Sequence, residues 1–285
     1  MSQFLQAIFS GLGLGALYAA IGIGLVVIHR VTHVINLAQG AVAVLGAYVM
    51  STAVQSLPWF IAVLLSAIAA SIAAAVIGLL VLSARDTFEY APIIMTLGIA
   101  FVAQALFILI WGQIPHSYPP VSSHAFTVLG AFVLPQQILL LAIIIALLIV
   151  LHAFFSTAYL GKALSAAAMN PRSAQLVGIN LVRAGVVAFV VGGFIAGLSG
   201  AVFGALVPVT PESHIALAVA GFAAAVFGDL DSPLRTVAGG LGLGILTSFA
   251  AAYGFPQYQE VVALGALVIL LFTRTIWARR GGVLT

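Results

Sequence analysis

The sequence predicts an all-α protein that crosses a lipid membrane many times. Of its 285 residues, 64% are hydrophobic and 5% are charged, whereas about a quarter of the residues in a soluble domain are charged. Apolar runs of about twenty residues, the length of a helical span, recur without the polar alternation of outer-membrane strands. These observations exclude a large soluble domain, and we expect residues 1–285 to form a single transmembrane domain.

Nine apolar segments are candidates for the spans, within a range of eight to ten that the chain length allows. The seventh is short, so it is either a partial or a re-entrant helix. In chain order, the segments are Phe4–Ile28, Val34–Val54, Pro58–Leu82, Tyr90–Trp111, Phe132–Phe155, Leu181–Val207, Ile215–Phe227, Leu234–Tyr253 and Val261–Trp277.

The first segment is expected to remain in the protein, because no basic residue precedes it as in a signal peptide. Gly11 and Gly15 are four residues apart on it, and Gly240 and Gly244 share this spacing on the eighth segment. Small residues repeat in the same way on the sixth segment, at Gly192, Ala196, Gly200 and Gly204. Since lipid gives helices no hydrophobic drive to associate, this spacing indicates close backbone packing. We expect contacts within one bundle, with dimerisation as the alternative.

The second and fourth segments carry polar groups at membrane depth. No Asp, Glu, Lys or Arg lies in the middle third of any segment, which argues against a carrier driven by ions or protons. The polar side chains are amides and hydroxyls: Asn36, Gln39, Thr96 and Gln104. They either bond neighbouring helices or line a polar route, and their occurrence together slightly favours the route. Gly40 and Gly46 would let the second segment unwind toward a cavity.

The connection at 156–183 is the longest on its side of the membrane. Its first part is rich in Ala, a strong helix former. Asn170 then suits a helix N-cap, Pro171 the first helical position and Gly178 the position after the helix end. Two short helices exceed what a plain loop needs, which favours a docking surface. A helix lying on the lipid is the alternative, disfavoured because large apolar residues are few.

The basic residues predict the orientation. With nine crossings, all nine Lys and Arg fall on one side, which the positive-inside rule identifies as cytoplasmic. The N-terminus is then outside and the C-terminus cytoplasmic. The residues are Arg30, Arg85, Lys162, Arg172, Arg183, Arg235, Arg274, Arg279 and Arg280. The net charge of +3 is too small to suggest a nucleic-acid partner.

The chain resembles the permease subunits of branched-chain amino-acid ABC importers, and its length resembles the shorter of their two types. The run Val34-Ile35-Asn36-Leu37-Ala38-Gln39-Gly40, followed by Leu45-Gly46-Ala47-Tyr48, is similar to their second span. Thr96-Leu97-Gly98 with Gln104 and Trp111-Gly112 is similar to their fourth, and 221–228 with 239–240 to their C-terminal paired spans. The segment 161–180 resembles their cytoplasmic coupling loop. Gln39 departs from the usual His, and Asp229 and Asp231 depart from glycines.

This resemblance implies an importer with two permeases, identical or homologous, two cytoplasmic ATP-binding subunits and an extracytoplasmic solute-binding protein in a bacterial inner membrane. Its solutes would be branched-chain amino acids or related amides, urea or aromatic acids. Asn36, Gln39, Thr96 and Gln104 would border the route. The residues that would couple to the ATPase are Gly161, Lys162, Asn170, Pro171, Arg172, Ser173, Gln175 and Gly178.

The chain itself is expected to be neither an enzyme nor a metalloprotein and to need no cofactor. A Walker A loop needs Gly-Lys-Ser/Thr, whereas the sequence reads Gly161-Lys162-Ala163, so ATP and magnesium would bind partner subunits. A secondary carrier or facilitator of a small neutral solute is the alternative function. An intramembrane serine protease is disfavoured, because Gly197-Leu198-Ser199-Gly200 lacks a histidine on a neighbouring span; His214 is expected in an outside loop.

Overall fold

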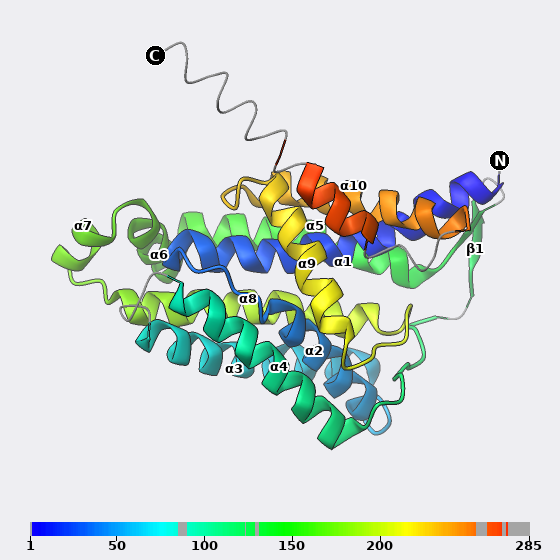
Figure 1. Ribbon diagram of the computed structural model, residues 1–285, viewed down its shortest axis with the longest axis horizontal. Helices are drawn as coiled ribbons and strands as arrows, with labels where there is room; N and C mark the ends of the chain where they lie inside the picture. The colour runs from blue at the N-terminus through cyan, green and yellow to red at the C-terminus, as the bar shows by residue number, and fades with distance from the viewer. Residues whose placement is uncertain are drawn as a thin grey trace, which may run out of the picture.

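A computed structural model describes residues 2–84, 90–122, 124–128, 131–254, 261–269 and 272. Its named helices are α1 (Ser2–Thr32), α2 (Gln39–Ala53), α3 (Trp59–Ser83), α4 (Ala91–Trp111), α5 (Pro135–Thr157), α6 (Tyr159–Met169), α7 (Pro171–Leu176), α8 (Leu181–Phe203), α9 (Ser213–Phe227) and α10 (Pro233–Ala252). Residues 261–269 are also helical. Figure 1 shows the long helices lying side by side, with α9 crossing α1 steeply.

The predicted multi-pass helical membrane protein is confirmed. Within the described residues, six helices are long and apolar enough to span a membrane: α1, α3, α4, α5, α8 and α10. The second and seventh predicted segments form the shorter helices α2 and α9, each of 15 residues. Much of the ninth segment lies outside the described residues. The nine crossings and the orientation of the termini therefore stay predictions.

Three predicted boundaries were wrong. The second segment does not begin as a helix at Val34, because residues 33–38 form a link and α2 starts at Gln39. The fifth begins at Pro135 instead of Phe132, since an antiparallel hairpin of β1 (Phe126–Val128) and β2 (Ala131–Val133) precedes it. The sixth ends at Phe203, four residues before Val207. The hairpin also makes the all-α description slightly incomplete.

The predicted glycine faces do pack within the bundle, so that interpretation is confirmed. A Cβ atom added to Gly11 would lie 3.0 Å from the carbonyl oxygen of Gly244, and one added to Gly15 would lie 2.7 Å from that of Gly240. On α8, a Cβ atom added to Gly192 would lie 2.9 Å from the carbonyl oxygen of Gly24. These distances leave no room for a side chain, so α1 contacts both α10 and α8 through backbone.

The element order α1–α2–α3 is repeated by α8–α9–α10. In each triplet a short helix lies between two long ones, and the connections at 54–58 and 228–232 have equal lengths. The contacts repeat as well: α1 packs along α10 as α8 packs along α3, and α2 contacts α8 as α9 contacts α1. Figure 1 shows that α1 and α8 run in opposite directions. The triplets therefore form an inverted repeat, an arrangement found in many transporters.

The loop after α4 is fastened to the end of α8. The phenol oxygen of Tyr118 donates to the carbonyl of Ala201 at 2.6 Å, and burial raises the pKa of Tyr118, so its hydroxyl remains a neutral donor. The backbone of His116 exchanges hydrogen bonds with Val209 at 3.0 and 2.9 Å. Gln136 on α5 adds a bond from its amide nitrogen to the carbonyl of Val202 at 2.6 Å. The segment leading into α9 is thereby fixed at this end.

Candidate functional site

The first part of the candidate site is the link between α1 and α2, where the helix is interrupted. The hydroxyl of Thr32 donates to the carbonyl of Ile28 at 2.8 Å and accepts from the amide of Val34 at 3.2 Å, which helps to end α1. His33 follows with a φ of 57°, in the left-handed region that non-glycine residues seldom occupy. The backbone therefore leaves the helix before Asn36, within the segment that the sequence assigned to one continuous span.

The buried amides of Asn36 and Gln39 bond each other and the neighbouring helix. Nδ2 of Asn36 donates to Oε1 of Gln39 at 3.0 Å, and Nε2 of Gln39 donates to the carbonyl of Gly192 on α8 at 2.8 Å. Both side chains are 0% exposed. Gln39 occupies the space that a Cβ on Gly24 would need. The start of α2 is thus tied to α8 by a fully buried polar contact.

Thr96 on α4 completes this polar cluster. Its hydroxyl accepts from the backbone amide of Leu37 at 3.2 Å, and its hydrogen is within reach of the carbonyls of Ile93 at 3.0 Å and Ile35 at 3.4 Å. Backbone groups of the link, which would be costly to leave unpaired in a membrane, thereby gain a partner. Of the four residues predicted to border a route, Asn36, Gln39 and Thr96 are brought together.

Gln104 does not join this cluster. It lies two turns further along α4, is partly exposed, and makes no hydrogen bond with any residue in the described part of the chain. Whether the four residues contact a solute stays a prediction.

Gly40 and Gly46 have a different role from the predicted one. A Cβ on Gly40 would overlap the carbonyl oxygen of His214, and one on Gly46 would overlap that of Gly197. Both glycines therefore permit close helix packing, and the unwound link lies before them. The expectation for His214 was also wrong, because it is 2% exposed in the first turn of α9. Its Nδ1 lies 2.8 Å from the carbonyl of Pro211, and its ring meets Phe101 edge-on with 6.0 Å between centroids.

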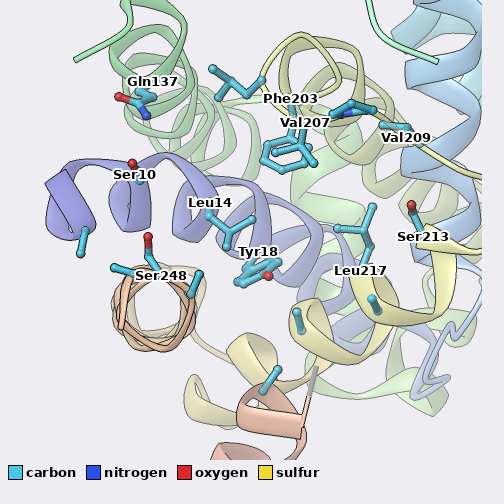
Figure 2. A pocket seen from close by; sticks show the side chains of 18 of the residues that line it. Ser10, Leu14, Tyr18, Gln137, Phe203, Val207, Val209, Ser213, Leu217 and Ser248 are labelled. Carbon is cyan, nitrogen blue, oxygen red and sulfur yellow. The ribbon is translucent and has the colours of Figure 1, made fainter. Parts of the chain in front are cut away.

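The second part of the site is a cavity of about 1320 Å³ beside α9. It lies at the end of the bundle that holds the N-terminus and the segment before α9, and none of the four predicted route residues lines it. Figure 2 shows the side chains converging on it from α1, α5, α8, α9 and α10. Its polar lining includes Ser10, Tyr18, Gln137, Ser213 and Ser248. None of these residues was predicted from the sequence, in which the polar positions near the start of the first segment were the available signal.

The cavity wall is mostly apolar, with amides and hydroxyls near its rim. Gln6 pairs with the backbone of Phe132, accepting at 2.7 Å and donating at 3.0 Å. The Oγ of Ser213 accepts from the amide of Thr210 at 3.1 Å. Among the described residues that line the cavity, Glu212 is the one ionisable carboxylate and none is Lys or Arg. This chemistry suits a neutral or zwitterionic small molecule better than an ion.

The helix α9 separates the cavity from the polar cluster. Leu217 and Ala220 line the cavity, whereas the backbone of His214 and Ala218 contacts Gly40 at the start of α2. Opposite faces of one short helix thus border the two parts of the site. From Ile215 to Phe227, α9 carries apolar side chains and one glycine, and these residues pack against α1.

The segment 156–183 has the predicted local structure. Oδ1 of Asn170 accepts from the amide of Ser173 at 3.1 Å, Pro171 is the first residue of α7, and Gly178 has a φ of 85°. Gly161 is buried against the end of α5, where a Cβ would overlap the carbonyl oxygen of Phe154.

The surface of this segment is polar and apolar together. Its exposed polar side chains include Lys162, Arg172, Ser173 and Gln175. Met169 and Leu176 are each 88% exposed. The two short helices therefore present a mixed surface away from the bundle, as Figure 1 shows for α6 and α7.

The turn between α9 and α10 carries ion pairs. Arg30 lies 3.2 Å from Asp231, and Arg235 lies 2.9 Å from Asp229. Asp229 has a φ of 62° at a position where the resembling permeases tend to have glycine. The cap before Leu234 is provided by Ser232, whose Oγ accepts from the amide of Arg235 at 3.4 Å. Neither aspartate therefore caps α10, and both pair with arginines instead.

The protease-like motif has no catalytic geometry. Ser199 is 0% exposed and its hydroxyl donates to the carbonyl of Ile195 at 2.7 Å. The neighbouring Gly197 and Gly200 pack against Ala70 and Ala43. Ser199 is therefore a satisfied residue in a packing face.

The chain matches a known family of proteins over most of its length. The family is described as "Branched-chain amino acid transport system / permease component", and its profile matches residues 7–271. LivH, a high-affinity branched-chain amino acid transport system permease protein of Escherichia coli K12, is 26% identical, covering 94% of this chain and 92% of LivH. BraD of Pseudomonas aeruginosa, of the same description, is 27% identical, covering 95% and 94%.

An archaeal relative is similar to the same extent. The probable branched-chain amino acid transport permease protein LivH of Methanocaldococcus jannaschii is 26% identical, covering 90% of this chain and 86% of that protein. No solved structure gives a significant match.

Proposed function

The chain belongs to the family of branched-chain amino acid transport system permease components, and on that premise we propose that it is the transmembrane permease subunit of an ATP-driven ABC importer. Its solutes are branched-chain amino acids or related small amides, urea or aromatic acids. The single observation that carries this proposal is the family match over 7–271. The absence of Lys and Arg among the described cavity-lining residues supports a neutral or zwitterionic solute.

The complete importer, in this proposal, contains two permeases, two ATP-binding subunits and an extracytoplasmic solute-binding protein in the bacterial inner membrane. ATP and magnesium bind the partner subunits, and the permease needs no cofactor. Residues 1–285 act as one permease domain. The exposed surface of α6 and α7 meets the ATPase, with Asn170, Pro171 and Gly178 shaping α7 and Arg172, Ser173 and Gln175 contacting the partner.

We place the solute route at α9. The cavity receives the solute on the extracytoplasmic side, and the polar cluster of Asn36, Gln39 and Thr96 stands beyond the helix. Movement of α9 relative to α2 would connect the cavity to the polar cluster, since α9 lies between them. The ATPases, acting through α7 and α8, would then drive the alternation between the arrangement in which α9 separates the cavity from the polar cluster and the arrangement in which the two are connected.

Reconstitution tests the proposed function. Proteoliposomes with the permeases and ATPases, supplied with binding protein and labelled leucine, should accumulate solute only when ATP is enclosed with the ATPase subunits. The control uses the same vesicles without ATP. Equal downhill uptake without ATPase subunits would instead identify a facilitator. Thermal-shift screening of the cognate binding protein then identifies the solute, because such proteins hold most of the specificity.

A further inference from the structure

The turn between α9 and α10 is fastened to the end of α1 by two polar contacts. Nε of Arg30 lies 3.2 Å from a carboxylate oxygen of Asp231. Nδ1 of His29 lies 3.3 Å from the carbonyl oxygen of Leu230, a residue 201 positions later in the chain. We call these four residues the clasp. It joins the last turn of one long helix to the segment that ends α9.

A small apolar cluster lies beside the clasp. Leu25 and Val26 of α1 pack with Ala225 of α9, and Phe222 and Leu230 pack against these three residues. In the described part of the chain, this cluster is separate from the main core. The last part of α9 therefore meets α1 through a small contact region of its own, and a change there need not disrupt the main core.

Backbone strain is concentrated around the clasp. Among the described residues, the non-glycine residues with positive φ are His33, Asp229 and Leu230, at 57°, 62° and 55°. Two of them lie in the turn, and the third follows α1, where its ring meets that of His29 edge-on with 6.0 Å between centroids. Such conformations cost free energy, and they cluster in segments that switch between two arrangements.

The clasp borders the candidate site. The link that leads to the polar cluster begins at His33, directly after α1, and α9 separates that cluster from the cavity. The clasp thus fixes the end of this separating helix against α1. In Figure 1, the end of α1 lies toward the end of the bundle that carries α6 and α7, the helices that meet the ATPase in the proposed importer.

The turn carries two ion pairs that differ in what they connect. Both pairs are exposed, so each is a weak contact. Arg30 and Asp231 belong to two elements that are distant in the sequence, whereas Asp229 and Arg235 are six residues apart, in the turn and the start of α10. Relative movement of α1 and α9 would therefore break the first pair and leave the second intact.

We propose that the clasp holds α9 in the position that separates the cavity from the polar cluster, and that the contact of Arg30 with Asp231 breaks whenever α9 moves to connect them. The ion pair and the packing of Leu230 favour the closed clasp, while the backbone strain favours its opening. The two arrangements are then close in free energy, as a reversible cycle requires. This inference rests on the proposed function, in which α9 moves during transport.

Cross-linking tests whether the clasp has to open. The chain has no natural cysteine, so Arg30→Cys with Asp231→Cys introduces a thiol pair across the clasp, and Asp229→Cys with Arg235→Cys introduces a matched pair within the turn. In the reconstituted importer, a short, reducible bifunctional thiol reagent should lower uptake to background in the first variant and leave it unchanged in the second. Reductant should restore uptake. Full uptake by the first variant, with its cross-link verified by mass spectrometry, would overturn the proposal.

Charge reversal tests the clasp without transport, in the assembled importer without ATP. Thr96→Cys places a thiol in the polar cluster, at a side chain that is 0% exposed. Adding Asp231→Arg, which repels Arg30, should raise the labelling rate of this thiol by about fivefold, the factor that corresponds to an exposed ion pair. Adding Asp229→Arg instead should not raise it. Exchanging the charges, with Arg30→Asp beside Asp231→Arg, should lower the rate again.

Labelling that Asp231→Arg leaves unchanged, or that the exchange of charges fails to lower, would overturn the proposal. The two measurements also separate it from the proposed function. An importer that shows the labelling contrast but accumulates no solute with ATP would refute the proposed function and leave the clasp standing. One that imports normally with the clasp cross-linked would refute the clasp alone.

Discussion

The inverted repeat produces two equivalent groups of three helices, each with the first helix of one triplet and the last two of the other, and these two groups are packed differently. On the side of α2, α3 and α8, Gln39 bonds the carbonyl of Gly192, and a Cβ on Gly193 would overlap Ala74. On the side of α1, α9 and α10, the corresponding short helix borders a cavity of about 1320 Å³, and the nearby Ser213 bonds its own turn at Thr210. We call these the closed half and the open half.

The difference shows how a repeated fold can hold two states at once. Both short helices pack closely against long helices at glycine positions. Of the two, only α2 carries a buried amide that donates a hydrogen bond to a long helix of its half. The start of α9 offers His214 and Ser213, whose side chains bond local groups at Pro211 and Thr210. A buried amide thus ties the short helix of the closed half to α8, whereas the side chains of α9 that follow His214 are apolar and hold the wall of the open half by packing.

Cysteine labelling should give an all-or-none contrast between the halves. The chain has no natural cysteine, so Ser248→Cys on α10 and Ser71→Cys on α3 each introduce the sole thiol. In open membrane fragments, a membrane-impermeant maleimide should label Ser248→Cys in the cavity and spare Ser71→Cys, which is 9% exposed. Equal labelling of both variants without nucleotide would show that the halves do not differ.

Gly46→Val should cause the largest loss of stability. The added side chain would overlap the backbone of Gly197, and two helix backbones cannot separate without disrupting the closed half. Overpacking typically costs about 1–3 kcal/mol and occasionally more, and we expect a cost above that range here because backbone atoms would have to move. Thermal unfolding in detergent should show a strongly lowered Tm, with Gly98→Val, where open space is available, as the control. An unchanged Tm for Gly46→Val would contradict the tight α2–α8 contact.

Gln39→Leu should have the next largest effect. It leaves Nδ2 of Asn36 and the carbonyl of Gly192 without their present partner, at a cost of about 1–3 kcal/mol for each buried group. Ser213→Ala in the open half loses the two local, partly buried bonds with Thr210 and should cost less, about 0.5–1.5 kcal/mol for each bond. Chemical denaturation and uptake measure both variants. A larger loss for Ser213→Ala would reverse our assignment of the polar tie.

Gln39→His introduces the residue usual at this position in the resembling permeases. It should change the transport rate while the affinity of the binding protein for solute stays the same, because selection occurs outside the membrane. Uptake kinetics and solute titration of the isolated binding protein, measured in parallel, check this separation. A transport rate that is unchanged by Gln39→His would count against a role for Gln39 at the route.

Gly178→Val should disturb coupling to the closed half, because Gly178 joins α7 to α8. A β-branched residue at its φ of 85° introduces about 1–2 kcal/mol of backbone strain. Membrane insertion should persist, while uptake, solute-stimulated ATP hydrolysis and co-purified ATPase fall. Arg172→Glu should lower the same three quantities without backbone strain. Normal uptake in both variants at matched expression would exclude this segment as the coupling element.

Asp231→Asn should have the smallest effect. The ion pair of Arg30 and Asp231 is exposed, with side chains 40% and 77% accessible, and such pairs contribute about 0–1 kcal/mol. The Tm should fall slightly at low ionic strength and converge on that of the unaltered protein in high salt. A loss as large as that of Gln39→Leu would mean that the turn between α9 and α10 holds the open half more firmly than packing does.

The sequence by itself determined the class of the protein and much of its local structure. Low charge and long apolar runs left no alternative to a helical membrane protein, because a soluble surface cannot be built from them. Asn170, Pro171 and Gly178 predicted the small helix α7, since caps and φ preferences are local properties. The glycine spacing predicted backbone contacts, because no other residue permits them.

Tertiary structure decided which helices those residues join and where the spaces between them lie. The break after Thr32 depends on Thr96 of α4. Its hydroxyl accepts a hydrogen bond from the amide of Leu37, which lies 59 residues earlier in the chain. The role of Gln39 depends on a carbonyl of α8 that is 153 residues away. The cavity is formed by α1, α5, α8, α9, α10, the helix at 261–269 and neighbouring non-helical residues, and the lining residues are individually ordinary. A cavity is a property of the gaps that remain after distant elements pack, so no local pattern in the chain could specify it.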